Sequence, residues 1–476
     1  MKKVDFKKAF WRLMNAGALF SAIGFASIHG QNAQADGVRR PSAPRAVAQS
    51  SSDDASIRRV MQEDAAPPAD EAPPAEGIPT FPANDKETAP EEPAAPEVWT
   101  LTNLFTNSDG SNPFKDSGVK ISGHMQWAYV SDPDGAFTGN GNTLSQQQWG
   151  FFGLHQQYLF MEKIADGSKG WCWGFLIDGM YGLQGFDGQS FGNTNPGHWD
   201  YLNGFDHGAY NFALPQAYGE LAYDKLSVKM GHFYTIIGYE VVPSTGQFFI
   251  TRQLTFWNSE PFTHSGALAT YKVSDKFSVL GGWVAGMDTG FYQFNGGSSF
   301  LGGFSWMIDD KTTLSYSMIW GNLGWRGNGA INSMILSRQW TEKISTVTQF
   351  DDLATDLNTL TTDPNNPNAY VFTNTPQNYN VQGGVPRQSI GLIQYGFYDF
   401  TPKVKGGVRG EWYRPDAVNY YTLSFGLNYK PYANLMFRPE IRQMWGDNHD
   451  IYTGAGNYSG NIYNQTVYAV DMIVTF

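Results

Sequence analysis

Charged side chains recur at every second or fourth position in two segments near the C-terminus, and three more lie in one long segment, expected to be a loop, in the middle of the chain. Residues at every second position of a β-strand point to the same face, so each even-spaced run places its charges on one side of a sheet. Opposite charges that face each other across a narrow water-filled passage create a transverse field, which orients dipolar solutes and filters ions. The charged residues are Lys405, Arg409 and Glu411, then Arg438, Glu440 and Arg442, and in the middle segment Glu240, Arg252 and Glu260.

The same residues allow a second interpretation, in which Arg–Glu contacts only keep a polar interior rigid. We expect this pairing role for Glu411 and Glu440. For Arg409, Arg438 and Arg442 the pairing role and a role in lining a pore both stay open. Screening over about 8–10 Å weakens any such field where the passage is wide.

The composition favours a β-barrel that spans a membrane. Of the 476 residues, 16% are charged and 15% are aromatic, whereas about 25% of an ordinary soluble domain is charged. The mean hydropathy of -0.37 is too low for a bundle of transmembrane helices, but it suits strands that alternate between lipid and water. The single cysteine, Cys172, excludes an intrachain disulfide and Cys-based zinc sites.

Apolar and polar residues alternate along several segments from Val119 onward. Residues 119–129 place Ile121, Met125 and Trp127 on one face and His124 and Gln126 on the other. Segments 226–230, 404–412, 421–429 and 468–476 repeat this pattern. Strands with one apolar and one polar face are typical of a barrel with lipid outside and water inside.

Short turns and long polar segments divide the rest of the chain. Seven turns alternate with eight loops, which requires sixteen strands, and short turns on one side with long loops on the other are typical of outer-membrane barrels. A soluble propeller or sandwich would need polar exposed faces, and here the strands would present continuous apolar ones. The turns lie at 165–170, 224–225, 274–276, 309–311, 342–343, 401–403 and 430–434, and the loops at 131–153, 182–210, 234–261, 286–298, 321–330, 352–388, 414–418 and 444–466.

The N-terminal part of the chain differs from the barrel. Residues 1–35 resemble a cleaved signal peptide, with a basic start, an apolar stretch from Leu13 to Ile28 and a small-x-small site at 33–35. Residues 36–98 contain 11 of the chain's 25 prolines and many Ala and Glu, so we predict a disordered periplasmic segment. Residues 99–118 lead into the barrel at 119–476.

The third long loop, 234–261, is rich in aromatic and apolar residues. A loop with this much apolar surface must cover it, and the nearest place is the lumen of its own barrel. We therefore predict that the loop folds inward and constricts the lumen.

Several motifs resemble the OmpL-like family of outer-membrane β-barrel porins of planctomycete-type bacteria. The resemblance covers about residues 99–476 and implies an outer-membrane pore for small solutes, without catalytic residues. The matching motifs are Trp99-Thr100-Leu101, Ile121-Ser122-Gly123, Gly231-His232-Phe233, Gly238-Tyr239-Glu240-Val241-Val242-Pro243, Asn258-Ser259-Glu260-Pro261-Phe262-Thr263-His264 and the terminal Phe476.

Four kinds of partner follow from this interpretation. We expect outer-membrane lipid around the barrel, small hydrophilic solutes within it, and the barrel-assembly machinery, which would read the last strand through Phe476. A homotrimer stays open by analogy with other porins of this strand number. No cofactor, metal or nucleic-acid site is predicted.

Passive diffusion of ions and small solutes through the outer membrane of a Gram-negative cell is the leading function. An occluded barrel that acts as an adhesin or structural surface protein is the alternative, favoured by the long loop 352–388. An enzyme is not expected, because His264 and Ser265 are adjacent in a strand and therefore point to opposite faces.

Overall fold

The computed structural model describes residues 99–131, 152–185, 188–190, 199–200, 203–205, 207, 210–291, 293, 296–356, 359–363, 366–373, 386–446 and 465–476. The predicted signal peptide (1–35) and the Pro-rich segment (36–98) lie outside these residues, so both stay predictions. Most of the predicted loops 131–153 and 444–466 also lie outside them. Within the described ranges, no helix is long and apolar enough to span a membrane.

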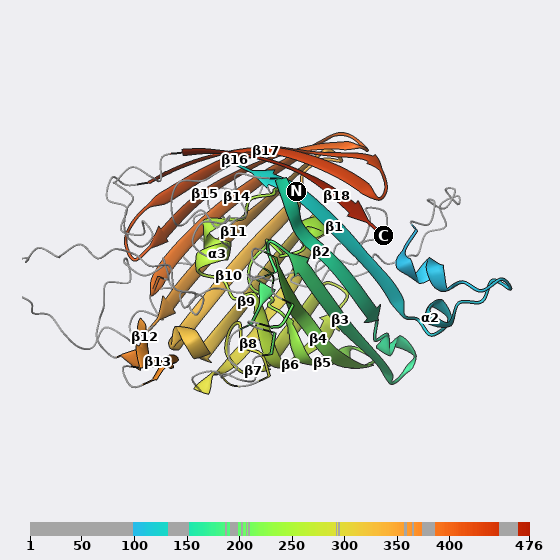
Figure 1. The fold of residues 1–476 in the computed structure, drawn as a ribbon, viewed down its shortest axis with the longest axis horizontal. Helices are drawn as coiled ribbons and strands as arrows, with labels where there is room; N and C mark the ends of the chain where they lie inside the picture. The colour runs from blue at the N-terminus through green and yellow to red at the C-terminus, as the bar shows by residue number, and fades with distance from the viewer. Residues whose placement is uncertain are drawn as a thin grey trace, which may run out of the picture. The chain divides into compact units, whose positions relative to one another are not determined.

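Sixteen strands close into one antiparallel barrel, which confirms the predicted fold class and strand number (Figure 1). Each strand pairs with its neighbours along the chain, β14 follows β11, and β1 pairs with β18 to close the barrel. The strands are β1 Lys120–Val130, β2 Phe152–Lys163, β3 Cys172–Gly182, β4 Asn211–Tyr223, β5 Leu226–Tyr234, β6 Thr263–Ser274, β7 Phe277–Val284, β8 Ser298–Asp309, β9 Thr312–Asn322, β10 Asn328–Gln339, β11 Ile344–Thr355, β14 Gln388–Thr401, β15 Val404–Pro415, β16 Tyr420–Tyr432, β17 Leu435–Gly446 and β18 Gln465–Thr475.

Short helices and one small sheet lie in the segments that precede or connect the barrel strands. The 3-10 helices are η2 Leu101–Phe105, η3 Gly167–Lys169, η5 Ser244–Gly246 and η7 Gly324–Arg326, and the α-helices are α2 Pro113–Asp116 and α3 Leu254–Asn258. The segment predicted as loop 352–388 contains a separate two-stranded sheet, β12 Thr359–Asp363 and β13 Asn366–Thr373. Threonines and the run Tyr370-Val371-Phe372 explain these strands, because β-branched and aromatic residues favour extended backbone.

Both ends of the described barrel are fixed to β1. Thr102 Oγ1 in η2 donates to the carbonyl of Ile121 at 3.0 Å and accepts from the amide of Ile121 at 2.6 Å. At the C-terminus, Phe476 exchanges two backbone hydrogen bonds with Gly123. A Cβ on Gly123 would lie 2.6 Å from the Phe476 ring, so the glycine leaves the space that this terminal aromatic side chain occupies.

The outer face of the barrel is apolar and the inner face of several strands is polar. Along β17, Arg438, Glu440 and Arg442 are buried inside, whereas Ile441 and Trp445 are exposed outside. The predicted alternation of apolar outer and polar inner residues therefore holds for this strand. We call the inward residues of β15 and β17 the charged wall, which consists of Arg409, Glu411, Arg438, Glu440 and Arg442.

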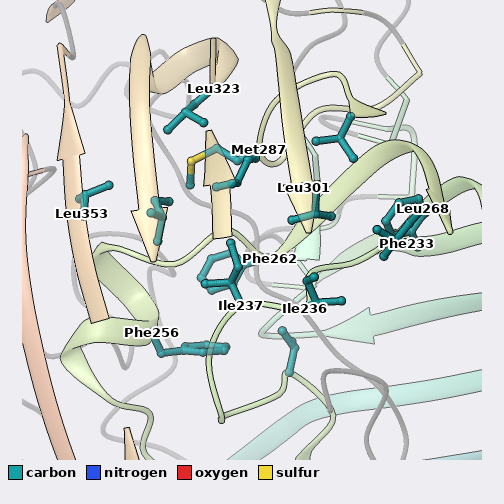
Figure 2. Packing of buried hydrophobic residues seen from close by; sticks show 14 of the residues in the cluster. Phe233, Ile236, Ile237, Phe256, Phe262, Leu268, Met287, Leu301, Leu323 and Leu353 are labelled. Carbon is teal, nitrogen blue, oxygen red and sulfur yellow. The ribbon is translucent and has the colours of Figure 1, made fainter. Parts of the chain in front are cut away.

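Among buried polar residues such as Ser317 and Asp351, strands β6, β8, β9, β10 and β11 each also point an apolar residue inward. These inward apolar residues form the apolar wall, and they belong to one buried cluster with residues of the segment between β5 and β6. Figure 2 shows Ile236, Ile237 and Phe262 of that segment beside Leu301 of β8. The apolar wall consists of Leu268, Leu301, Ile319, Ile331 and Leu353.

Candidate functional site

The segment 235–262, which we call the lumen loop, lies between the charged wall and the apolar wall. It begins after β5 ends at Tyr234 and stops before β6 begins at Thr263, within one residue of the predicted loop 234–261. It contains η5 and α3, and almost all of its residues are buried, α3 completely. The structure thus places the predicted loop against inward side chains on both sides.

Glu240 and Arg409 form an ion pair at the centre of this contact. Arg409 Nη1 lies 2.5 Å from Glu240 Oε1, and both side chains are almost fully buried. The Tyr395 hydroxyl and the backbone N–H of Gln253 also donate to Glu240, each at 2.8 Å. Arg409 in turn donates to the carbonyl of Thr251 at 2.8 Å. A buried carboxylate is stable in this position because a cation and two further donors replace its water.

Two carboxylates of the charged wall accept backbone amides of the lumen loop. Glu411 accepts from the amides of Leu254 and Thr255 at 2.9 and 2.8 Å, where α3 begins and its amides lack intrahelical partners. Glu440 accepts from the amides of residues 250 and 251 at 2.7 and 2.9 Å. The arginine contact predicted for these glutamates is present for Glu440, which lies 3.8 Å from Arg409, whereas Glu411 accepts from backbone amides and threonine hydroxyls.

Arg438 connects the wall to the tip of the lumen loop. Its guanidinium lies 2.5 Å from Asp471 Oδ2 on the adjacent strand β18. The same group donates to the carbonyls of Ser244 and Gln247 at 2.8 and 2.5 Å. Arginine suits this position because its planar group can bind a carboxylate and carbonyls at the same time.

The remaining three cations occupy different environments. Arg442 donates to the Arg252 carbonyl at 2.7 Å, and Arg252 donates to the Val242 carbonyl. Lys405 is 40% exposed, with Asp399 at 3.6 Å. Lys405 is thus the predicted site cation that keeps clear contact with solvent.

Glu260 meets a second carboxylate that sequence analysis missed. The side-chain nitrogen Nε2 of Gln349 donates to Glu260 at 2.7 Å and to Asp351 at 3.0 Å, so one donor bridges two buried acids. Burial, and then the charge of Asp351, raises the pKa of Glu260 well above its usual range. Gln349, Asp351 and Leu353 alternate along β11, so their spacing could have shown that Asp351 points inward.

Of the nine predicted site residues, eight therefore gather where the lumen loop contacts the barrel wall. Glu240 and Arg409 pair directly, and Glu411, Glu440, Arg438 and Arg442 bind the loop from the wall. Each of these eight is at most 6% exposed. Lys405 lies apart from them.

A cavity of about 520 Å³ lies next to the lumen loop, towards the short-turn end of the barrel. Tyr239, Gln247 and Phe248 of the loop line one side, and Lys405 and Asn428 line the other. Asp310 and Lys311 of the turn between β8 and β9 also contribute to its lining. This is space that a small hydrated solute could occupy.

His264 and Ser265, which the sequence predicted to point to opposite faces, bond to different residues. His264 bonds to Thr235 Oγ1 at 2.8 Å, whereas Ser265 lies 2.8 Å from Nδ1 of its cross-strand partner His232. Ser265 donates its only proton to the carbonyl of Thr289, so it accepts from His232 and is not deprotonated by it. Among the described residues, no group of three or more His, Cys, Asp or Glu could hold a metal ion.

Comparison with known proteins adds a family match. The family model described as beta-barrel porin-2, OmpL-like, matches residues 118–476. No curated protein is significantly similar in sequence.

Solved structures of similar fold include the outer-membrane channel DcaP of Acinetobacter baumannii, with a TM-score of 0.49, 9% identity, and coverage of 76% of this chain and 98% of that chain. The anion-selective porin from Comamonas acidovorans has a TM-score of 0.47, 11% identity, and coverage of 75% and 99%.

Proposed function

Because this chain belongs to the OmpL-like beta-barrel porin-2 family, an outer-membrane channel family, we propose that ions and small hydrophilic solutes diffuse through its barrel and that the lumen loop constricts their path. The family match covers the whole barrel. The barrel itself has the apolar outer face and polar inner residues that a membrane channel needs.

The position of the lumen loop against both the charged wall and the apolar wall is the observation that carries this proposal. The loop leaves the apolar wall, binds the charged wall, and reaches β1 and β2 beyond it. There Ser244 Oγ donates to Gln126 at 2.6 Å, and Gln156 donates to the Val242 carbonyl at 3.1 Å. A solute that crosses the barrel must therefore pass beside the loop.

In this proposal the predicted charges act in two ways. The eight buried residues hold the loop in place, so they set the width and the fixed field of the constriction. Lys405 faces the cavity beside the loop and contacts passing ions directly. Fixed charges next to a narrow aqueous path change the local concentration of ions of each sign.

An occluded barrel with an adhesive or structural role is the second candidate. The nearly complete burial of the lumen loop favours it, because a fully packed lumen would leave no continuous path. The two candidates differ in conductance, not in fold.

Export and assembly complete the proposal. We propose that residues 1–35 direct export and are cleaved, and that the assembly machinery recognises β18 with its terminal Phe476. A homotrimer remains our expectation by analogy with other porins. Cross-linking of intact membranes, followed by electrophoresis without heating, would detect the trimer.

Single-channel recording of the purified mature protein in a planar bilayer under a salt gradient tests the main proposal. Stepwise openings are expected, and their reversal potential gives the preferred sign of the ion. Correctly folded, heat-modifiable protein without conductance would reject the channel and support the occluded barrel.

A further inference from the structure

The outer face of the barrel carries an apolar groove that crosses strands β11, β14, β15, β16 and β17 and ends at Tyr468 of β18. Its volume is about 760 Å³. Gly396 and Gly406 contribute no side chains to its floor, and Phe400 and Phe425, each about half exposed, stand at its sides. A Cβ on Gly406 would lie 2.7 Å from the Phe400 ring, so the ring leans over the glycine.

One row of cross-strand partners connects this groove to the short-turn end of the barrel. Arg338 lies next to the last residue of β10, whereas Phe425 and Ile441 lie in the middle of their strands. The row therefore begins near the short turns and continues to the middle of the barrel wall, as strands tilted against the membrane normal require. Its members are Arg338, Thr346, Gly396, Val408, Phe425 and Ile441.

The beginning of the row carries a cation on the outer surface. Arg338 lies 4.6 Å above the ring of Trp340, whose indole N–H donates to Thr346 Oγ1 at 2.8 Å. Asp309 is 3.6 Å from the guanidinium, whose Nη1 donates to Thr312 Oγ1 at 2.6 Å. Lys343 in the adjacent turn is exposed and precedes Ile344, which lines the groove.

We propose that this surface binds one phospholipid, with an acyl chain in the groove and the phosphate on Arg338 and Lys343. The cations lie at the end of the barrel, where headgroups are, and the groove continues from them towards the middle of the wall. Arginine and tryptophan are both suited to the headgroup region, since each combines an apolar body with a polar group.

The chemistry favours a zwitterionic phospholipid over a second copy of the chain. Asp309 next to Arg338 offers an anion for the ammonium of an ethanolamine headgroup. A second copy in the expected homotrimer would meet this surface with a different surface of its own, which would have to supply both an apolar ridge and an anion, whereas one phospholipid carries both. Lipid chains are as apolar as the groove, so specific retention requires both the fit of the chain and the charged headgroup contacts.

Native mass spectrometry of the full-length mature protein, released from detergent that contains palmitoyl-oleoyl-phosphatidylethanolamine, tests the site. The wild-type barrel is expected to retain one lipid. Gly396→Leu fills the groove and Arg338→Gln removes the headgroup contact, and each should reduce the retained lipid at least tenfold. Heat-modifiable migration verifies that every variant is folded.

Matched controls separate this site from general lipid adhesion. Gly219→Leu adds the same side chain at an exposed position of β4, where a Cβ meets nothing within 4 Å, and Lys225→Gln removes a cation from another short turn. Both should retain the lipid as wild type does.

The proposal is overturned if the wild type retains none, if the controls lose as much as the site variants, or if palmitoyl-oleoyl-glycerol, which lacks the phosphate, is retained equally. Dimers that Gly396→Leu dissolves would instead identify a second copy as the occupant.

Discussion

The two walls of the barrel hold the same loop by opposite chemistry. The charged wall binds it through groups of fixed geometry, such as the 2.5 Å pair between Arg409 and Glu240. The apolar wall binds it through close packing of Leu301, Leu353 and their neighbours against Ile237, Phe256 and other loop residues.

This difference predicts how each wall fails. A buried charge is stable only while its partner is present, so removal of one partner leaves an uncompensated charge. An apolar contact is shared among many atoms, so removal of one side chain leaves a cavity but keeps the other contacts. We therefore expect the charged wall to fix the position of the loop and the apolar wall to add graded stability.

Arg409→Met should have the largest effect. It leaves Glu240 buried without its cation and should reduce the stability of the docked loop by about 3–5 kcal/mol. The loop should then leave the lumen in part of the molecules, which raises mean conductance and its noise. Planar-bilayer recording and protease cleavage between residues 235 and 262 would measure both effects.

The double variant Glu240→Gln with Arg409→Met removes the unpaired charge together with its cation. It should recover a large part of the lost stability, because a neutral amide costs less to bury than a carboxylate. If the stability losses of the single variants Glu240→Gln and Arg409→Met add up to the loss of the double variant, the proposed role of the pair is contradicted.

Leu301→Ala tests the apolar wall. It should lower the free energy of unfolding by about 3 kcal/mol, as expected for a buried leucine that leaves a cavity, while conductance stays close to wild type. Thermal unfolding in detergent, read from the heat-modifiable band, gives the stability change. Leu221→Ala on the exposed outer face of β4 is the control and should change little. If Leu301→Ala changed the conductance as much as Arg409→Met, the two walls would not differ in how they hold the loop.

The contrast between the walls also explains what could be predicted from the sequence. Strands such as β17 alternate clearly because one face meets lipid and the other carries Arg438, Glu440 and Arg442. The predicted short turns and long loops between such strands then indicated sixteen strands. The charged residues of the site could be selected because charges are rare in this chain and the alternation places them inside.

The apolar wall could not be read in the same way. On β9, Ser315 and Ser317 share the inner face with Ile319 while apolar residues face outward, so spacing alone does not show which inward residue meets the loop. Apolar residues on both faces are themselves a signal that something covers the inner one, and the apolar loop 234–261 was the candidate. Which wall residue meets which loop residue depends on backbone geometry that spacing does not encode.

Glu260→Gln should have a smaller, pH-dependent effect. The pKa of Glu260 is raised by burial and by Asp351, so the stability that its protonated form contributes is fully present below the pKa of Glu in the unfolded chain. That stability is lost as the pH rises through the raised pKa. The variant keeps the neutral form at every pH, so it should unfold at a temperature similar to wild type near pH 4 and a few °C higher at alkaline pH. If the unfolding temperatures of wild type and Glu260→Gln depended on pH in the same way, this role of Glu260 would be refuted.

Lys405→Gln should have the smallest effect and should alter selectivity alone. Lys405 is 40% exposed and its contact with Asp399 is 3.6 Å, so its loss should change the free energy of unfolding by less than about 0.5 kcal/mol. A unit charge acts on an ion about 8 Å away in water by about 0.5 kcal/mol, which corresponds to about a twofold change in the anion-to-cation permeability ratio. The reversal potential under a salt gradient should therefore shift towards cation preference, and the shift should shrink at high salt because the charge is screened.

Lys225→Gln, which removes a cation from a short turn away from the cavity, should leave the reversal potential unchanged. An equal shift in both variants would mean that net charge, and not the cavity beside the lumen loop, sets the preference.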